Sequence, residues 1–131
     1  MILLDTHAAA WLVLRPQRLS RPATAAIRRA QTSGGLAIAS VTLMELVQML
    51  ATGVIRPTGT PQSRLKAFVT ETAVTTHDLT LEIAAIAAHL PPSFPADPFD
   101  RVIAATAIAR RLRLVTADTR IQQSGSVETI W

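Results

Sequence analysis

Short runs of branched apolar residues, each followed by a helical pattern, restrict most strongly how this chain can fold. The clearest runs are Met1–Leu4, Leu36–Ser40 and Leu112–Ala117. Runs this short and this apolar are typical of parallel strands that are buried on both faces. Because parallel strands are joined by crossover helices, the sequence predicts an α/β fold. We expect a three-layer α/β/α sandwich with a mainly parallel central sheet.

Capping and turn residues divide the rest of the chain into helices and further strands. Ser20 before Arg21-Pro22 is typical of a helix start, and Gly53 is typical of a helix end. Helices are expected near residues 20–33, 42–52, 62–71, 80–89 and 98–111, and further strands near 73–76 and 127–131. Without a linker, repeat or low-complexity segment, residues 1–131 are expected to form a single domain of ordinary size.

Acidic residues are few and lie at the junctions between these segments. Five of the nine acids, Asp5, Glu45, Asp97, Asp100 and Asp118, stand where an apolar run meets the next element. Asp5 and Asp118 each follow an expected strand. Glu45 lies about one turn into the helix that follows a third expected strand. Ligands of open parallel sheets bind outside the carboxyl ends of the strands. We therefore expect separate segments to bring these acids to one place.

Most of these acids also have a local interpretation. Pro98 fits the first position of a helix, which makes Asp97 its N-cap and places Asp100 in the first turn. Acids at both positions satisfy free backbone N–H groups and the helix dipole. Asp118 could likewise cap the short segment after it, and Asp5 could be a turn residue at a strand end. A shared site explains all of them at once.

Glu45 has a separate local interpretation that depends on where its helix begins. Thr42-Leu43-Met44-Glu45 spells a capping box, in which the glutamate would bond back to the cap residue. If Ser40 capped the helix instead, the Glu45 carboxylate would be free to reach a metal.

The charge balance points to a polyanionic partner. Thirteen basic residues, twelve of them Arg, give a net charge of +4, which suits nucleic acid, although such a surface could also meet an acidic protein. The absence of cysteine excludes disulfides, zinc fingers and cysteine nucleophiles. Carboxylate ligands favour Mg²⁺ or Mn²⁺ over zinc. An acidic pocket with a basic rim suits metal-assisted cleavage of a phosphate backbone.

Hydropathy gives no sign of a membrane protein. The longest apolar stretch is far too short to cross a bilayer, and the N-terminal run lacks the basic region and cleavage site of a signal peptide. A cytoplasmic location without membrane contact is expected. The aromatic residues are too few and too scattered for a base-stacking platform, so most are expected in the core; they are Trp11, Phe68, Phe94, Phe99 and Trp131.

Four short motifs in this order resemble the PIN-domain ribonucleases, and within them the VapC-type toxins of toxin–antitoxin pairs. They are Leu3-Leu4-Asp5-Thr6-His7, Ala39-Ser40-Val41-Thr42-Leu43-Met44-Glu45-Leu46, Asp97-Pro98-Phe99-Asp100-Arg101-Val102-Ile103-Ala104-Ala105 and Leu114-Val115-Thr116-Ala117-Asp118. The resemblance spans nearly the whole chain. It implies a metal-dependent endoribonuclease that acts on RNA and leaves a 3′-hydroxyl and a 5′-phosphate.

The resemblance also implies roles for particular residues. Asp5, Glu45, Asp100 and Asp118 match the acids that bind Mg²⁺ or Mn²⁺ in the family, which makes them the expected catalytic residues. Asp97 is expected to cap and orient the turn, since the Asp-x-x-Ile-Ala spacing selects Asp100.

Several neighbours of these acids are further candidates. Thr6, Ser40 and Thr116 could hold a carboxylate or a water by hydroxyl hydrogen bonds, or could make only local turn bonds. Arg101 could meet the scissile phosphate, although pairing with a carboxylate is the expected arrangement. His7 could touch the substrate or simply lie on the surface.

Two other functions remain open on the sequence alone. One is a catalytically inactive module that keeps the PIN fold and binds RNA or protein. The other is a phosphatase of the haloacid dehalogenase kind, which also has an Asp after its first strand. That class needs a second Asp two residues later, where this chain has His7.

The family resemblance implies two protein partners. One is a VapB-like antitoxin, which we expect to place an Arg or Lys beside the carboxylates in competition with the metal. The other is a second copy of the chain, in a homodimer. Apolar residues of the early segments could form the dimer interface or the core; they are Trp11, Leu12, Leu46, Val47 and Leu50.

Overall fold

The structure, a computed structural model, describes residues 1–53 and 58–131. Five strands form one sheet in the order β3-β2-β1-β4-β5, and every neighbouring pair is parallel. This confirms the predicted α/β fold around a parallel sheet. The elements are β1 (Ile2–Leu4), α1 (Thr6–Leu14), the 3-10 helix η1 (Pro16–Arg18), α2 (Arg21–Thr32), β2 (Leu36–Ala39), α3 (Ser40–Ala51), α4 (Pro61–Thr72), β3 (Thr75–His77), α5 (Leu81–His89), α6 (Pro98–Arg110), β4 (Arg113–Val115), α7 (Thr119–Ser124) and β5 (Thr129–Ile130).

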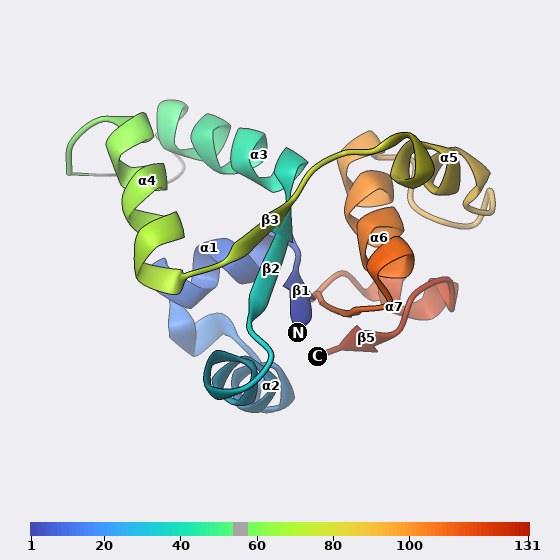
Figure 1. The fold of residues 1–131 in the computed structure, drawn as a ribbon, viewed down its shortest axis with the longest axis horizontal. Helices are drawn as coiled ribbons and strands as arrows, with labels where there is room; N and C mark the ends of the chain where they lie inside the picture. Colours follow the sequence, from blue (N-terminus) through green and yellow to red (C-terminus); the bar gives the residue numbers. More distant parts are fainter. Residues whose placement is uncertain (54–57) are drawn as a thin grey trace.

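Alternating side chains of the strands supply two separate apolar layers. Ile2 and Leu4 of β1 pack with α1, α2 and residues of α3 and α4 on one face of the sheet. Leu3 points to the opposite face, where it packs with α6 and α7, and α5 covers the outside of α6 through Ile83 and Ala87. Figure 1 shows α1 and α4 on one side of the sheet and α5, α6 and α7 on the other. The predicted three-layer sandwich is therefore observed.

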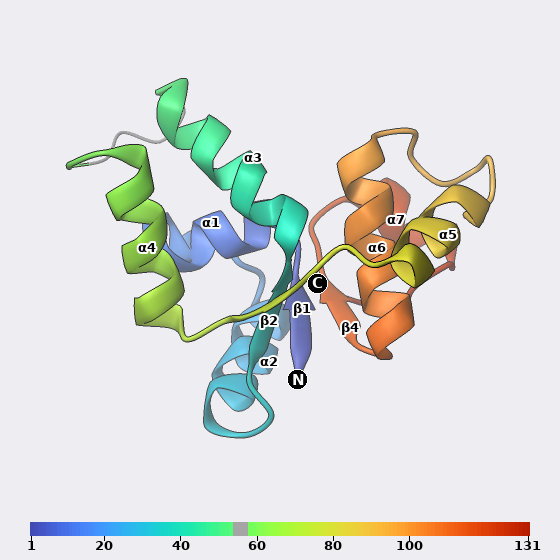
Figure 2. The same cartoon turned by 45° about the horizontal axis from the view of Figure 1, so that its top comes forward.

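Parallel pairing brings several helix starts to one edge of the sheet. α1, α3 and α7 each begin one to four residues after a strand, so their N-termini lie at the carboxyl ends of the strands. α6 ends just before β4, which places its C-terminus at the amino edge and its N-terminus at the carboxyl edge. Figure 2 shows the same arrangement with the top of the molecule turned forward. This edge is where the sequence places the clustered acids.

Element boundaries differ from the predicted ones where a local conformation intervenes. α3 begins at Ser40, two residues earlier than predicted, with Ala39 as its N-cap. The strand predicted from Ala73 begins at Thr75, because Ala73 takes a left-handed conformation (φ 50°) that ends α4. Only Thr129–Ile130 of the predicted last strand pair with β4. Within the described residues, no helix combines the length and apolar character that crossing a membrane requires.

Candidate active site

A cleft of ≈ 950 Å³ lies at the carboxyl edge of the sheet and contains the clustered acids. Five of the nine acidic residues line it, and they come from four different helices or their caps. In the described part of the chain, three arginines line the same cleft. The acids are Asp5, Glu45, Asp97, Asp100 and Asp118, and the arginines are Arg15, Arg18 and Arg120. The predicted gathering of acids from separate segments is therefore present in the structure.

Asp5 lies at the base of the cleft, directly after β1. It is the N-cap of α1, and its Oδ1 accepts a hydrogen bond from the Ala8 N–H at 2.7 Å. Only 9% of the residue is exposed. Burial raises the pKa of Asp5, while the nearby Thr116 hydroxyl and the Ala8 N–H oppose that rise. The capping geometry and the place in the cleft are compatible, because a cap uses only one of the two carboxylate oxygens.

Glu45 reaches the cleft from the second turn of α3. Its Oε1 accepts a hydrogen bond from the Thr6 hydroxyl at 2.6 Å, and that hydroxyl lies 3.3 Å from the Thr42 hydroxyl. The capping-box alternative is wrong, because Thr42 is fully buried inside the helix rather than at its start. Burial raises the pKa of Glu45, the Thr6 hydrogen bond opposes the rise, and the charge of Asp97 adds to it.

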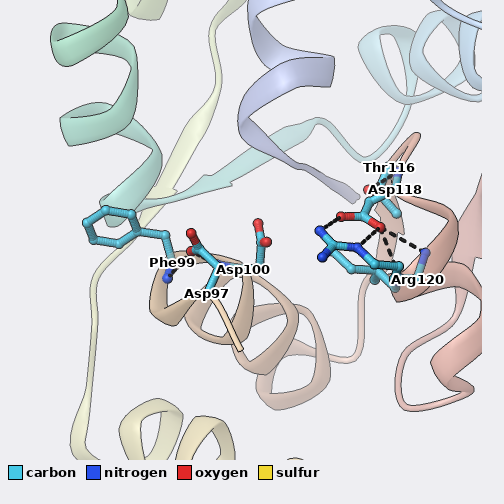
Figure 3. Close-up of polar contacts among 7 residues, drawn as sticks. Asp97, Phe99, Asp100, Thr116, Asp118 and Arg120 are labelled. Atoms are coloured by element: carbon cyan, nitrogen blue, oxygen red, sulfur yellow. Dashed lines mark hydrogen bonds and ion pairs between the residues drawn. The ribbon is translucent and has the colours of Figure 1, made fainter. Parts of the chain in front are cut away.

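Asp97 and Asp100 stand together at the start of α6 but have different surroundings (Figure 3). Asp97 is the N-cap, as predicted, and its Oδ1 accepts from the N–H groups of Phe99 at 2.8 Å and Asp100 at 3.1 Å. The Asp100 carboxylate is half-buried. Burial, and then the charges of the neighbouring acids beginning with Asp97, raise the pKa of Asp100 to about 6.

Asp118 is the N-cap of α7 and is paired with an arginine of its own helix. Its Oδ1 accepts from the Arg120 N–H at 2.8 Å, and Arg120 Nη2 lies 3.0 Å from its Oδ2 (Figure 3). The Arg120 side chain lowers the pKa of Asp118. The buried Thr116 hydroxyl accepts from the Asp118 N–H at 3.1 Å. Thr116 thus holds the backbone of this turn, while Thr6 holds the carboxylate of Glu45.

Two predicted neighbours of the acids are used elsewhere. The Ser40 hydroxyl accepts from the Leu79 N–H at 3.2 Å, which ties the start of α3 to the segment after β3. Arg101 does not pair with a carboxylate among the described residues, contrary to expectation. Its guanidinium donates to the backbone oxygens of Ala87, Leu90 and Pro95 instead. Arg101 therefore satisfies carbonyl groups at the end of α5 and in the loop that precedes α6.

The donor set of the cleft fits a divalent cation with oxygen ligands. Residues 1–53 and 58–131 contain no group of three or more acidic or imidazole side chains that is already arranged around one metal position. Several of the acids make local bonds instead. Arg120 contacts both oxygens of Asp118, and the Asp97 carboxylate accepts from a backbone N–H group. Burial, and then repulsion from the neighbouring acids, raise the pKa of Asp100, and a hard cation such as Mg²⁺ would favour its ionised form.

One end of the cleft was not foreseen from the sequence. Arg18 lies over the ring of Trp11, with its Cζ atom 4.6 Å from the ring centroid, and both residues line the cleft with Arg15. The spacing of residues 11, 15 and 18 gave no usable signal, because α1 ends at Leu14 and the backbone of Arg15 is not helical. Trp11 was expected in the core or a dimer interface, and the structure shows it half-buried at the cleft wall.

The expected dimer residues also divide between core and surface. Leu46 is only 4% exposed and belongs to the core with Leu12 packed against it, so an interface role for Leu46 is wrong. Trp11, Leu12, Val47 and Leu50 are half-buried. For these four residues the dimer interface remains a prediction.

Comparison with known proteins agrees with this geometry. A family model described as PIN domain matches residues 2–125. The chain is 40% identical over 121 residues to a protein named Ribonuclease VapC22 from Mycobacterium tuberculosis, which covers 92% of this chain and 89% of that protein. The chain also superposes on solved protein structures. VapBC2 from Rickettsia felis, bound to a promoter DNA fragment, gives a TM-score of 0.72 at 20% identity, covering 98% of this chain and 97% of that chain. FitAcB from Neisseria gonorrhoeae gives 0.71 at 24% identity, covering 98% and 96%.

Proposed function

This chain belongs to the PIN-domain family and to its VapC-type ribonuclease toxins, and from that premise we propose that residues 1–131 form a single metal-dependent endoribonuclease domain. Its substrate is RNA, and its catalytic residues are Asp5, Glu45, Asp100 and Asp118. The observation that carries this proposal is the convergence of these acids in one cleft from segments far apart in the sequence. The haloacid dehalogenase alternative is not retained, because the family is a different one.

The four acids would hold Mg²⁺ or Mn²⁺, which when bound supplies charge neutralisation at the phosphate and activation of a water. Other side chains of the protein orient these acids. Thr6 donates a hydrogen bond to Glu45 and so fixes the direction of that carboxylate. Asp97 orients the first turn of α6 and thereby the backbone that carries Asp100. Burial of Asp5 restricts water around it, which strengthens its interaction with a cation.

Asp5→Asn tests this function most directly. Asn keeps the shape and the capping oxygen of Asp5 but removes its charge, so the variant should fold and lose RNA cleavage. Asp78→Asn is the matched control, because Asp78 is exposed and does not line the cleft. Cleavage of a single-stranded RNA is measured with Mg²⁺, Mn²⁺ and EDTA, and circular dichroism checks the fold. A folded Asp5→Asn variant that cuts RNA at the parental rate would contradict the proposal, and binding without any cleavage by the parent would favour the inactive RNA-binding alternative.

The proposal includes restraint by a VapB-like antitoxin that inserts an Arg or Lys beside the acids. A guanidinium can bridge two carboxylates, so inhibitor and metal would compete for one charged position. Inhibition of cleavage by the antitoxin should therefore weaken as Mg²⁺ or Mn²⁺ is raised. Inhibition that does not depend on the metal concentration would contradict this mechanism and leave the nuclease assignment intact.

A cytoplasmic location and a homodimer complete the proposal. Trp11 and Leu12 of α1 and Val47 and Leu50 of α3 are the remaining candidates for the dimer interface. Light scattering at micromolar concentration should report a dimer, and Val47→Asp should shift it toward monomer, since a buried unpaired charge is costly. A monomeric parent protein would contradict the pairing.

A further inference from the structure

Both acidic and basic side chains line the cleft, and the proposed metal site uses only the acids. A second group of lining residues is the Arg18–Trp11 ledge, which we define as Trp11, Arg15 and Arg18. Trp11 comes from α1, Arg15 joins α1 to η1, and Arg18 ends η1. All three line the same ≈ 950 Å³ cleft as the carboxylates.

Aromatic packing holds the ledge in place. Trp11 is backed by Trp131, with ring centroids 5.8 Å apart, and flanked by His7 at 5.8 Å. Arg18 lies on the indole with its Cζ atom 4.6 Å from the centroid, which is within the range of a cation–π interaction. The guanidinium is therefore supported on one face by Trp11. Arg18 is exposed and lines the cleft, so its guanidinium is accessible to a ligand there.

Three arginines of the chain have side-chain partners in the structure, and the two arginines of the ledge are not among them. Arg120 is paired with Asp118, and Arg113 lies 3.9 Å from Glu128. Arg101 donates to three backbone oxygens. Within residues 1–53 and 58–131, neither Arg15 nor Arg18 forms an ion pair or a side-chain hydrogen bond. Two unpaired guanidinium groups in one cleft favour an anionic ligand.

The ledge also lies at a suitable distance from the proposed site of cleavage. Trp11 is six residues after Asp5 on the same helix, which corresponds to roughly 9 Å along the helix axis at 1.5 Å per residue. Cleft-lining residues continue along this side of α1 from His7 to Leu14. A strand whose phosphate lies at the carboxylates would thus pass the ledge with a neighbouring nucleotide.

We propose that the Arg18–Trp11 ledge is a nucleotide-binding subsite for single-stranded RNA, next to the scissile phosphodiester. Arg18 stacks a nucleobase on its open face, Arg15 and the Arg18 edge donate to a phosphate, and Trp11 positions the guanidinium. Unstacked bases of single-stranded RNA bind to aromatic rings and guanidinium planes in this way. The proposal rests on the ribonuclease function proposed above and adds a determinant of where the RNA is held.

Salt-dependent binding tests the phosphate contact. Affinity of the full chain for a single-stranded oligoribonucleotide is measured in EDTA, so that the strand is not cut, over a range of salt concentrations. Arg18→Ala should weaken binding and lower the slope of log affinity against log salt by about 0.7 for one lost phosphate contact. Arg18→Lys should keep the slope. Arg28→Ala is the matched control: it removes the same charge from exposed α2, outside the cleft, and should leave the slope unchanged.

An abasic scan tests the base contact. One abasic nucleotide is moved along the oligoribonucleotide, and the position that faces the ledge should cost the parent roughly 5- to 150-fold in affinity, the range of one stacked base. Arg18→Ala should be insensitive to the abasic position, and Arg18→Lys nearly so, because an ammonium has no plane for stacking. Trp11→Leu should show a partial loss, since the guanidinium is no longer held. If Trp11→Leu does not fold, the Arg18 variants decide the result.

Cleavage kinetics separate this proposal from the nuclease assignment. With Mg²⁺, Arg18→Ala should raise KM with kcat nearly unchanged, because the ledge binds ground state and transition state alike. A parent that cuts RNA while Arg18→Ala matches it in affinity, salt slope and KM would overturn the subsite and leave the nuclease function standing. The subsite would also be wrong if Arg18→Ala kept RNA binding and lost only antitoxin binding, since the ledge would then be a protein-binding surface.

Discussion

Helices α6 and α7 both begin with an aspartate N-cap, but the pKa of a carboxylate is raised at the start of α6 and lowered at the start of α7. Each begins with an aspartate N-cap whose Oδ1 accepts from two backbone N–H groups, Asp97 in α6 and Asp118 in α7. In α7 the third residue of the motif is Arg120, which lowers the pKa of Asp118. In α6 the motif ends with a second acid, and the pKa of Asp100 rises to about 6. The cap is thus a local feature, while the charge state depends on what surrounds it.

The comparison also separates two uses of a carboxylate. Asp118 already has a cation, supplied by its own helix, and a metal would have to displace or share with Arg120. Burial, and then the charges of the neighbouring acids, raise the pKa of Asp100, so a metal would stabilise its ionised form. We therefore expect α6 to dominate metal binding and α7 to modulate it.

The largest expected effect is at Asp100. Asp100→Asn should reduce RNA cleavage at saturating Mg²⁺ by more than about 100-fold, whereas Asp97→Asn should reduce it by about tenfold, the lower end of the range for a group that only orients a ligand. The reason is that Asn can replace a capping oxygen but not a charged ligand. Initial cleavage rates on one RNA measure both, with urea unfolding as the control for folding. Equal losses at the two positions would contradict the assignment of Asp100 as ligand and Asp97 as cap.

The second effect is on stability in the absence of metal. The pKa of Asp100 is about 6 in the folded chain against 3.8 for an ordinary Asp, so between these values the folded state binds more protons than the unfolded state. The free energy of unfolding should therefore fall as pH rises from 4 to 6 and stay low above it. The expected loss is roughly 1–2 kcal/mol, which allows for solvent screening of this half-exposed group.

Urea unfolding in EDTA at several pH values measures this dependence. Asp100→Asn should flatten the curve between pH 4 and 6, and Asp78→Asn should not. Asp118 acts in the opposite sense, because a lowered pKa contributes stability that is lost only as pH falls below the ordinary Asp value. A parent protein that is more stable at pH 7.5 than at pH 5 without metal would argue against a repulsive acidic cleft.

The third effect concerns the N-cap of α6. Asp97→Ala should lower the free energy of unfolding by about 1 kcal/mol, because the N–H groups of Phe99 and Asp100 lose their acceptor. Asp97→Asn should cost only a few tenths of that, since Asn caps nearly as well. Thermal or urea unfolding of the two variants gives the comparison. If Ala and Asn were equally destabilising, the capping bonds would not be the reason for Asp97 at this position.

The smallest effect is at Arg120. An ion pair with a fully exposed partner contributes little to stability because solvent screens it, so Arg120→Ala should barely change the free energy of unfolding. Freed of its guanidinium, Asp118 should bind Mg²⁺ up to about fivefold more tightly, as measured by calorimetric titration. Arg113→Ala, which breaks the ion pair with Glu128 elsewhere on the surface, is the matched control. Weaker metal binding in Arg120→Ala would show that the arginine positions Asp118 rather than competing for it.

Much of the fold could be predicted because its signals are local. The buried strands follow from runs of branched residues, and the start of α6 follows from Asp97 and Pro98, since capping and the proline ring involve only neighbours in the chain. Prediction was less accurate at α3. Thr42 and Glu45 fit a capping box by spacing, but the helix starts at Ser40 and buries Thr42. The spacing of residues in the sequence does not show which side chains are buried, and burial decided where α3 begins.

By itself the sequence determined that acids from separate segments would meet at the carboxyl edge of a parallel sheet, because strand direction and crossover connections leave the strand ends at one edge. Only the tertiary structure decided what each polar group contacts. Thr6 and Glu45 are 39 residues apart and form a hydrogen bond of 2.6 Å, while Arg101 lies next to Asp100 and donates to α5 and the following loop instead. Trp11 and Trp131 pack together from opposite ends of the chain. Such contacts depend on distances between packed elements, which no short stretch of sequence contains.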